Sequence, residues 1–496
     1  MSGGGCQVGA QRTKMGPLDP TQAQRDAEDL GRFGYAQQLL RRMGGFGNFA
    51  LSFSIISILT GAVTQYTWGL SWGGPAGVVG GWLLVSVMTL LVACSMAELA
   101  SAYPTAGALY HWSAILGGPG WGFFTAWLNT IGQFAITAGI DYGLAEFVAD
   151  MLDLPRAHSV LPLYAAILIS HGLLNHFGIG VVEILNRFSA WYHMVGVVVL
   201  VVMLAAFAPH QPVSFLWKTV QRTDHGLLYC LALSLLQAQW TFTGYDASAH
   251  VTEETVDPRH SAPWGIVLSV GVSALFGLAL LSGVTLSIHD LAPALSAQNA
   301  FRAILLHALG ARLGAGAIWL TMGAMWFCGL GSVTSNSRML FAFARDGGLG
   351  ERRLLARVSE RFRTPHRAVW LAVAMAFVVA LWGGTNSVIV AMSTIALYAS
   401  YGLPVALALV RGPGRIERGP WTLGRASRAV AALALAWIGI ISVLFVLPPL
   451  QQVGYTFSGC VAAIALYWLL VARSRFRGPQ VTRAGGGALT QRGHGS

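Results

Sequence analysis

The feature that most constrains this chain is a succession of long apolar segments separated by short polar connections. A helix needs about 20 mostly apolar residues to cross a bilayer, and twelve stretches of that kind lie between residues 46 and 473. Only 10% of the 496 residues are charged, which is too little for the surface of soluble domains. We therefore predict an all-α, polytopic membrane protein. The predicted spans are residues 46–70, 76–100, 121–149, 159–178, 184–208, 227–252, 264–287, 314–343, 368–384, 386–409, 429–447 and 455–473.

The basic residues predict how these spans are oriented. They concentrate before the first span, between the eighth and ninth, between the tenth and eleventh, and after the last. Because loops rich in Lys and Arg stay on the cytoplasmic side, we expect a plasma membrane protein with both termini in the cytoplasm. The formal net charge is +11, but its placement at span ends indicates a lipid bilayer and not nucleic acid as the partner.

The sixth predicted span loses its apolar character at its centre. The stretch W-T-F-T-G-Y-D-A-S-A-H-V-T-E-E, residues 240–254, follows an apolar run from Leu227 to Gln239. Irregular backbone at membrane depth is tolerated only inside protein or beside a water-filled cavity, and an ionisable residue there indicates a functional site. We interpret the stretch as a helix broken at the midplane, as in transporters that direct helix ends at a substrate.

The first span carries the same signal, because Thr60-Gly61 near its centre matches Thr243-Gly244 in the sixth. Two matching breaks predict that spans 1–5 and 6–10 form two structural repeats of inverted orientation. The predicted organisation is a cytoplasmic N-terminal tail, disordered by its polar composition, then one transporter domain and a second cytoplasmic tail. These cover residues 1–43, 44–473 and 474–496, and the domain divides into repeat one (44–209), repeat two (227–409) and two extra helices (427–473).

Broken helices offer a specific binding chemistry. Their exposed N–H groups suit a carboxylate and their exposed C=O groups suit an ammonium, so a zwitterion satisfies both. An aromatic side chain covers an ammonium by cation–π contact, and Asp246 either recognises the amine, carries a proton or serves as a partner for a nearby donor. The predicted substrate-binding residues are Ser57, Thr60, Gly61, Trp240, Phe242, Thr243, Gly244, Tyr245 and Asp246.

Several stretches together resemble one known family. They are E-L-A-S-A-Y-P-T-A-G-A-L-Y-H-W (98–112), the span-6 stretch, S-N-S-R-M-L-F-A-F-A-R-D-G-G (335–348) and A-L-Y-A-S-Y-G-L-P (396–404). They resemble the amino acid/choline transporter family of the amino acid–polyamine–organocation superfamily, which includes γ-aminobutyrate, choline and amino acid permeases. The resemblance implies a five-plus-five inverted repeat with two extra helices, and secondary transport. Span 1 reads S-I-L-T-G (57–61) where the superfamily commonly has G-S-G-I-F.

The resemblance also implies where a driving ion acts. Some proton-coupled members place a Lys in span 5, where sodium-coupled members hold an ion. The basic side chain in that part of this chain is His193, and Thr334 and Ser335 on span 8 are similar to the hydroxyl positions of the ion site. His193, Thr334 and Ser335 are therefore the predicted coupling residues, with a proton as the expected ion and sodium as the alternative.

Other chemistries fit the sequence less well. Intramembrane aspartyl catalysis needs two adjacent carboxylates, and the spacing of Asp141 and Asp246 does not pair them. His171 and His176 are five residues apart, which is not the zinc-binding spacing, and the five cysteines are interpreted as buried apolar residues. We expect no enzyme activity, cofactor or metal. A sodium-coupled symporter, an amino acid exchanger and a non-transporting amino acid receptor are the alternatives.

Overall fold

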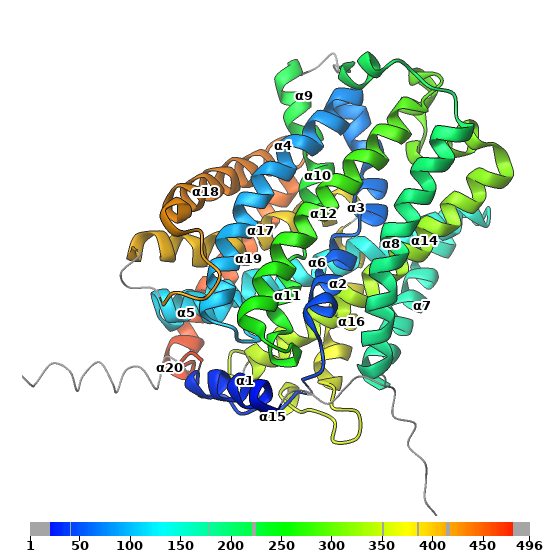
Figure 1. Cartoon of the computed structure of the whole chain (residues 1–496). Coiled ribbons are helices and arrows are strands. Elements are labelled where there is room, and N and C mark those ends of the chain that lie inside the picture. Colours follow the sequence, from blue (N-terminus) through cyan, green and yellow to red (C-terminus); the bar gives the residue numbers. More distant parts are fainter. Residues whose placement is uncertain are drawn as a thin grey trace, which may run out of the picture.

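The computed structural model describes residues 20–39, 41–177, 179–220, 225–349, 352–383, 386–412 and 417–479, and within these ranges the chain forms helices and no β-strand. Figure 1 shows a bundle with α1 and α20 at one end, called the α1 end, and α9 at the other, called the α9 end. The first half contains α1 (Pro20–Arg32), α2 (Gly45–Ile56), α3 (Ile58–Thr64), α4 (Tyr66–Ala102), α5 (Leu109–Gly117), α6 (Pro119–Met151), α7 (Arg156–Phe177), α8 (Ile179–Phe207) and η1 (Val213–Trp217). The second half contains α9 (Leu227–Ser234), α10 (Leu236–Thr241), α11 (Ala247–His250), η2 (Thr252–Glu254), α12 (Pro258–Leu286), α13 (Leu291–Ser296), α14 (Ala300–Arg345), α15 (Arg352–Leu355), α16 (His366–Gly383), α17 (Asn386–Arg411), η3 (Gly424–Ala426), α18 (Ser427–Leu444), α19 (Gln451–Tyr467), η4 (Trp468–Ala472) and α20 (Arg473–Arg475).

Nine helical segments of the described chain are long and apolar enough to cross a membrane. The other three predicted spans are helical but differ in length or polarity. The segments Leu227–Thr241 and His366–Trp382 are apolar but short. Helix α6 is 33 residues long and carries buried polar side chains along its middle, including Asn129, Gln133 and Asp141. The count of twelve spans therefore stays a prediction, and the all-helical membrane architecture is confirmed.

The first predicted span is interrupted at one residue. Helix α2 ends at Ile56 and α3 begins at Ile58, because Ser57 adopts a left-handed conformation with φ 33° and ψ 87°. Further along, α4 is divided where Gly74 leaves helical geometry with φ 66° immediately before Pro75. Glycine adopts such angles without steric cost, so the sequence itself marks where the first span ends and the second begins.

The sixth predicted span is interrupted over a longer stretch. Helix α10 ends at Thr241 and α11 begins at Ala247, and between them Gly244 has φ 87°. A Cβ on Gly244 would lie 2.3 Å from Cγ2 of Ile55, so this glycine also allows the close approach of α2. The two interruptions are thus in direct contact.

A row of small residues joins the two interrupted segments on the α9 side of the breaks. Gly61, Gly69, Gly73 and Gly77 are spaced four or eight residues apart and lie against α9 and α10. A Cβ at Gly61 would lie 2.7 Å from the Cα of Thr241, and one at Gly73 would lie 2.8 Å from the Cβ of Ser234. Small residues allow membrane helices to pack with their backbones close together. We call this row the glycine seam.

The N-terminal region corrects one expectation. The sequence predicts a disordered tail for residues 1–43, but its described part contains α1 and a non-helical segment, residues 33–39 and 41–43, called the N-terminal strap. The backbone N–H of Met43 donates to the carbonyl of Glu254 at 2.9 Å, and its carbonyl accepts from Val256 at 2.8 Å. Although the strap is polar in composition, four of its apolar or aromatic side chains are buried, namely Phe33, Tyr35, Leu39 and Met43. In the C-terminal tail predicted for 474–496, residues beyond 479 lie outside the described chain.

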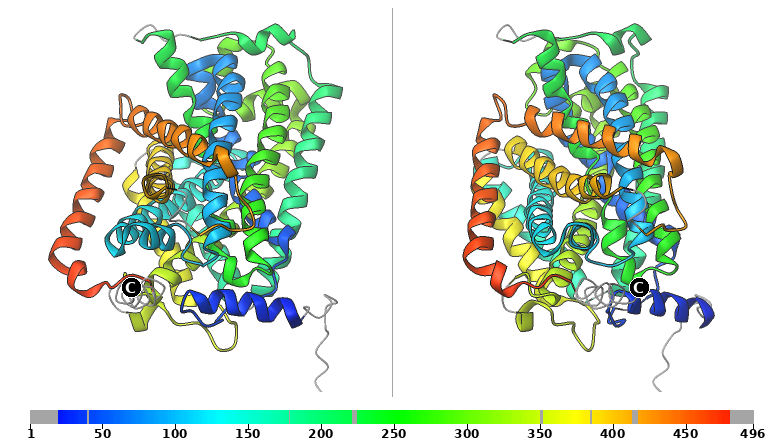
Figure 2. Two further views of the ribbon diagram at one scale, coloured as in Figure 1. Left: turned by 60° about the vertical axis from the view of Figure 1, so that its left-hand side comes forward. Right: turned by 90° about the vertical axis from the view of Figure 1, so that its left-hand side faces the viewer.

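The last two long helices lie on the outside of the bundle. Figure 2 shows α18 crossing the bundle and α19 running along its edge toward the α1 end. Helix α18 contacts α4 and α17, while α19 contacts α6 and α17. Neither helix lines the small cavity described next.

Candidate functional site

The two interruptions face one another across a small cavity. The cavity is about large enough for one water molecule. Four predicted residues line it, namely Thr60, Gly61, Trp240 and Thr243. Its remaining lining residues are Ile55, Ile56, Ile136, Ile140, Thr241 and Cys328.

The first interruption is held by hydroxyl groups and one histidine. The Ser57 hydroxyl lies 2.6 Å from the Thr60 hydroxyl and 2.7 Å from Nε2 of His193. The other ring nitrogen, Nδ1, lies 2.8 Å from the carbonyl of Ser189 and must donate to it. His193 in its neutral form therefore accepts from Ser57. The N–H groups of Thr60 and Gly61, predicted to bind a carboxylate, already donate to the Ser57 carbonyl at 2.8 and 2.9 Å.

Two carbonyl groups beside the cavity are capped by side chains. The Cys328 thiol donates to the carbonyl of Ile55 at 3.2 Å, and the Thr243 hydroxyl donates to the carbonyl of Trp240 at 2.6 Å. All four residues line the cavity. Because a thiol or hydroxyl is a modest donor that can rotate away, an ammonium can replace it at these two carbonyls with a stronger, charge-assisted hydrogen bond.

The predicted aromatic residues separate into two groups. Trp240 lines the cavity, and its indole Nε1 is buried without a hydrogen-bond partner in the described chain. Phe242 instead packs on Trp82 with ring centroids 4.6 Å apart, and Tyr245 packs on Tyr401 at 5.1 Å. Only Trp240 is placed to contact a ligand in the cavity.

Asp246 lies outside the cavity, in a polar cluster of its own. Its carboxylate accepts from the Tyr401 hydroxyl at 2.8 Å and from the Asn129 amide at 3.1 Å. The Gln133 amide lies 3.3 Å away and His250 Nε2 lies 3.1 Å away. These contacts join α6, α11 and α17. The alternative role of Asp246 as a partner for nearby donors is therefore the one its geometry favours.

The structure does not bring the predicted coupling residues together. Thr334 donates to Oδ1 of Asn175 on α7 at 2.8 Å, whereas His193 contacts Ser57 at the first break. Ser335 has a buried hydroxyl without a partner in the described chain.

The α9 end contains a larger polar pocket. Its volume is about 360 Å³, and Thr64 and Gly143 in its wall lie one helical turn beyond the cavity residues Thr60 and Ile140. An ion pair of Arg156 with Glu146 and Asp150 contributes to the same region, with nitrogen–oxygen distances of 3.4 and 2.5 Å. The pocket extends from the surface of the bundle toward the small cavity.

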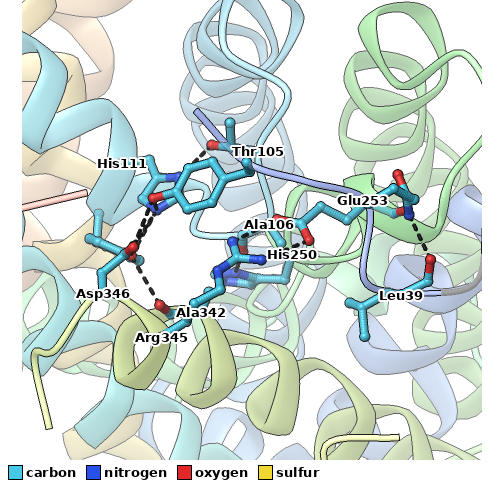
Figure 3. Close-up of polar contacts among 12 residues, drawn as sticks. Leu39, Thr105, Ala106, His111, His250, Glu253, Ala342, Arg345 and Asp346 are labelled. Atoms are coloured by element: carbon cyan, nitrogen blue, oxygen red, sulfur yellow. Dashed lines mark hydrogen bonds and ion pairs between the residues drawn. The ribbon is translucent and has the colours of Figure 1, made fainter. Parts of the chain in front are cut away.

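The α1 end is closed by buried ion pairs. Figure 3 shows Arg345 facing Glu253, and the two form a bidentate pair with distances of 3.0 and 2.8 Å. Nε of Arg338 donates to Glu254 at 3.1 Å. The Arg345 guanidinium also lies over the ring of Tyr35, 4.2 Å from its centroid. These pairs tie the end of α14 to η2 and to the N-terminal strap.

A second cluster adjoins these ion pairs (Figure 3). The carboxylate of Asp346 accepts from the Tyr35 hydroxyl at 2.9 Å and from the Tyr110 hydroxyl, and it lies 3.0 Å from Nε2 of His111. Burial by itself raises the pKa of Asp346, but the contacts with His111, Tyr110 and Arg345 outweigh it, so the pKa lies below its ordinary value. The ionised form of Asp346 thus stabilises the closed α1 end.

Sequence reasoning missed several residues of the site. Ile136 and Ile140 line the cavity one turn apart on α6, and Cys328 caps a carbonyl at its edge. The spacing of the two isoleucines is a helical signal, but it does not distinguish a cavity wall from lipid-facing residues. Cys328 has no sequence signal beyond its apolar surroundings.

An all-helical bundle of apolar spans with a buried cavity between two interrupted helices is the architecture of a membrane permease. The family profile described as amino acid permease matches residues 43–470, and the chain belongs to the amino acid permease family.

Several characterised and uncharacterised permeases are similar to this chain over most of its length. The amino-acid permease BAT1 of Arabidopsis thaliana is 37% identical, covering 91% of this chain and 95% of its own. Its homolog in Oryza sativa subsp. japonica is 35% identical, covering 91% and 94%. The GABA-specific permease of Saccharomyces cerevisiae is 25% identical, covering 97% and 91%.

Proposed function

We propose that this permease is a secondary active transporter that moves an amino acid or a related amine by alternating access, driven by protons. The observation that carries the proposal is the pair of interrupted helices facing one small cavity, with the carbonyls of Ile55 and Trp240 capped only by Cys328 and Thr243. A substrate ammonium displaces these caps and gains two charge-assisted hydrogen bonds. The name of one relative, the GABA-specific permease, supports a γ-aminobutyrate-like substrate. A choline-like substrate completes the proposed range.

The carboxylate of a zwitterion finds a donor in Trp240. Its indole N–H is buried beside the cavity without an acceptor in the described chain, and an unpaired buried donor is costly until a ligand satisfies it. The cavity is smaller than an amino acid, so binding requires Ile136 and Ile140 to move outward from α2 and α10.

Alternating access follows from the difference between the two ends. The α9 end has an open polar pocket, and the α1 end is closed by the Arg345–Glu253 and Arg338–Glu254 pairs. We assign the α1 end, which carries α1 and α20, to the cytoplasmic side on the basis of the positive-inside rule. The structure then corresponds to a state closed toward the cytoplasm. We propose that residues 44–209 and 227–409 form an inverted repeat, in which the two breaks would be equivalent.

Proton coupling is proposed because titratable groups lie close to the first break. His193 contacts Ser57 directly. Protonation at Nε2 turns this nitrogen from an acceptor into a donor, which changes how the left-handed conformation of Ser57 is stabilised. Thr334 and Ser335 are the residues of the alternative, in which sodium replaces the proton.

Uptake into proteoliposomes tests the function. Radiolabelled γ-aminobutyrate, choline and the standard amino acids are supplied while the pH and sodium gradients are varied independently. Accumulation of at least one amine or amino acid that follows the pH gradient is expected. Accumulation that follows sodium alone would exclude proton coupling, and a protein that takes up none of them would not be a transporter of this class.

Substituting Trp240 tests the binding geometry. Trp240→Phe removes the indole donor, and loss of a hydrogen bond to a charged group costs about 1.5–3 kcal/mol, so the affinity for zwitterions should fall by about 10-fold or more. Choline has no carboxylate and should compete as before. Trp437→Phe is the matched control, because that indole donates to Gln239 on α10 and does not line the cavity. Equal weakening of choline and zwitterions would contradict the assignment.

A further inference from the structure

A buried acid–histidine pair lies behind the cavity wall and takes no part in the site described above. Oδ2 of Asp141 on α6 lies 3.1 Å from Nδ1 of His171 on α7, and both side chains have an exposed fraction of 0%. The other atoms of the pair, Oδ1 of Asp141 and Nε2 of His171, have no hydrogen-bond partner in the described chain. The pair is therefore incompletely satisfied at two atoms.

Asp246, His193 and the Asp141–His171 pair differ in how well their polar atoms are satisfied. Asp246 has four polar contacts, and both ring nitrogens of His193 have partners. Asp141 has a single contact, with His171. Hydrogen bonds to a carboxylate favour its charged form, so the charged form is well supported at Asp246 and poorly supported at Asp141.

The protonation states of the pair follow from these contacts. When His171 is neutral and donates from Nδ1 to an ionised Asp141, the pair has a net charge of −1 in an apolar interior. One added proton, at Nε2 of His171 or Oδ1 of Asp141, makes it neutral. In that form the buried pair carries no uncompensated charge, whose burial is expensive. The titratable groups that face the pair are Tyr164 on α7 and Cys328 on α14, and both are uncharged near neutral pH.

The pair is mechanically linked to the cavity. Gly329 on α14 covers it, since a Cβ there would lie 1.9 Å from Oδ1 of Asp141 and 2.6 Å from Cε1 of His171. The neighbouring residues Cys328 and Ile140 line the cavity on its other side. Cys328 also caps the carbonyl of Ile55, so a substrate that displaces this thiol loosens α14 against α2. A shift of α14 changes how tightly Gly329 covers the pair and admits water to it.

We infer that Asp141 and His171 form the proton-binding site of this transporter, taking up one proton per cycle from one side of the membrane and releasing it to the other. This inference rests on the proposed proton-driven function. It assigns the transported proton to the pair, and leaves to His193 the positioning of Ser57.

The test uses the full-length protein in proteoliposomes with the membrane potential clamped. The probe is whichever labelled amino acid the wild type accumulates, and a pH-sensitive dye in the lumen reports protons. A pH difference of about one unit supports about tenfold accumulation of a substrate carried with one proton. Asp141→Asn should lose this accumulation and the substrate-induced pH change, while exchange of internal for external substrate continues.

A second variant and a control make the outcome decisive. His171→Gln keeps a donor toward Asp141 but removes the second basic nitrogen, so the pH profile of exchange should shift even if Asp141→Asn does not fold. His176→Gln lies on the same helix, where His176 accepts from Trp370 at 2.9 Å, and should remain coupled. The inference is overturned if Asp141→Asn retains tenfold accumulation or if the pH profile of His171→Gln is unchanged. It is also overturned if His193→Gln is the only one of these variants that loses coupling. A wild type that ignores the pH gradient instead contradicts the proposed function itself.

Discussion

At the scale of single residues, the break in the sixth segment depends on Gly244. Its φ of 87° and the predicted 2.3 Å contact of a Cβ with Ile55 leave no room for a side chain. We expect Gly244→Ala to lower stability by about 1–2 kcal/mol from the left-handed conformation alone, and to reduce substrate affinity because α2 is displaced. Gly271→Ala on α12, where nothing lies within 4 Å, is the control. Thermal unfolding and binding of the purified variants check this, and wild-type values for Gly244→Ala would disprove it.

Asp346 gives a prediction on pH at the same scale. Because its pKa in the folded protein lies below the ordinary value of about 3.9, its ionised form stabilises the protein above that pH. This contribution disappears as the pH falls through the lowered folded value. Unfolding temperatures of the wild type should therefore decline on acidification more steeply than those of Asp346→Asn. Asp290→Asn, at an exposed carboxyl, should follow the wild type. Parallel curves for the wild type and Asp346→Asn would show that the carboxylate has no such role.

Residues were predicted unevenly from the sequence. The break at Gly244 was predicted, because polar residues and glycine interrupt an apolar run there. In the first segment the break lies at Ser57 and not at the predicted Thr60-Gly61 pair, which is helical within α3. The direction of each side chain at a break could not be predicted, since non-helical backbone removes the periodicity on which such inferences depend. Phe242 accordingly packs on Trp82, and Asp246 lies in a separate polar cluster. Of these three residues, Trp240 lines the cavity.

At the scale of elements, the glycine seam predicts a double-mutant effect. Gly73→Ala should destabilise the protein and slow transport, because its Cβ would lie 2.8 Å from the Cβ of Ser234. Adding Ser234→Gly should recover most of the loss, since the two positions are in contact and their effects are not additive. Gly80→Ala in the same helix, whose Cβ would meet only Trp217 at 3.5 Å, should be nearly neutral. Additive losses in the double variant would contradict the seam.

The order of α1 and the N-terminal strap was not predicted from the sequence, for one physical reason. The N-terminal strap and α1 were expected to be disordered, because the apolar residues there are few and form no long run. The strap is ordered by backbone hydrogen bonds to Glu254 and Val256, which lie more than 200 residues away in the chain. Contacts of that separation leave no local pattern, whereas apolar runs such as α16 and α17 were predicted to within two residues at each end.

At the scale of the whole molecule, closure of the α1 end depends on buried charge. Glu253→Gln leaves Arg345 uncompensated, and removing one partner of a buried ion pair costs about 3–5 kcal/mol. The unfolding temperature should drop, and Ala106→Cys, placed at this end, should react faster with a maleimide. The double variant Glu253→Gln with Arg345→Gln should be more stable than Glu253→Gln alone, because the guanidinium that lost its bidentate partner is removed as well. A double variant less stable than the single one would argue against the ion pair as the source of the effect.

The N-terminal strap continues directly into the first half of the interrupted helix, since Met43 and Gly45 are two residues apart. The ion pairs of the α1 end and the small cavity therefore lie near opposite ends of one helix, α2. Helix α2 has 12 residues and is about 18 Å long, and its far end carries the Ile55 carbonyl beside the cavity. A displacement of the N-terminal strap is therefore transmitted along α2 to the cavity. A ligand that enters the cavity displaces the strap in the same way. Occupancy of the proposed site can in this way be sensed at the α1 end of the bundle.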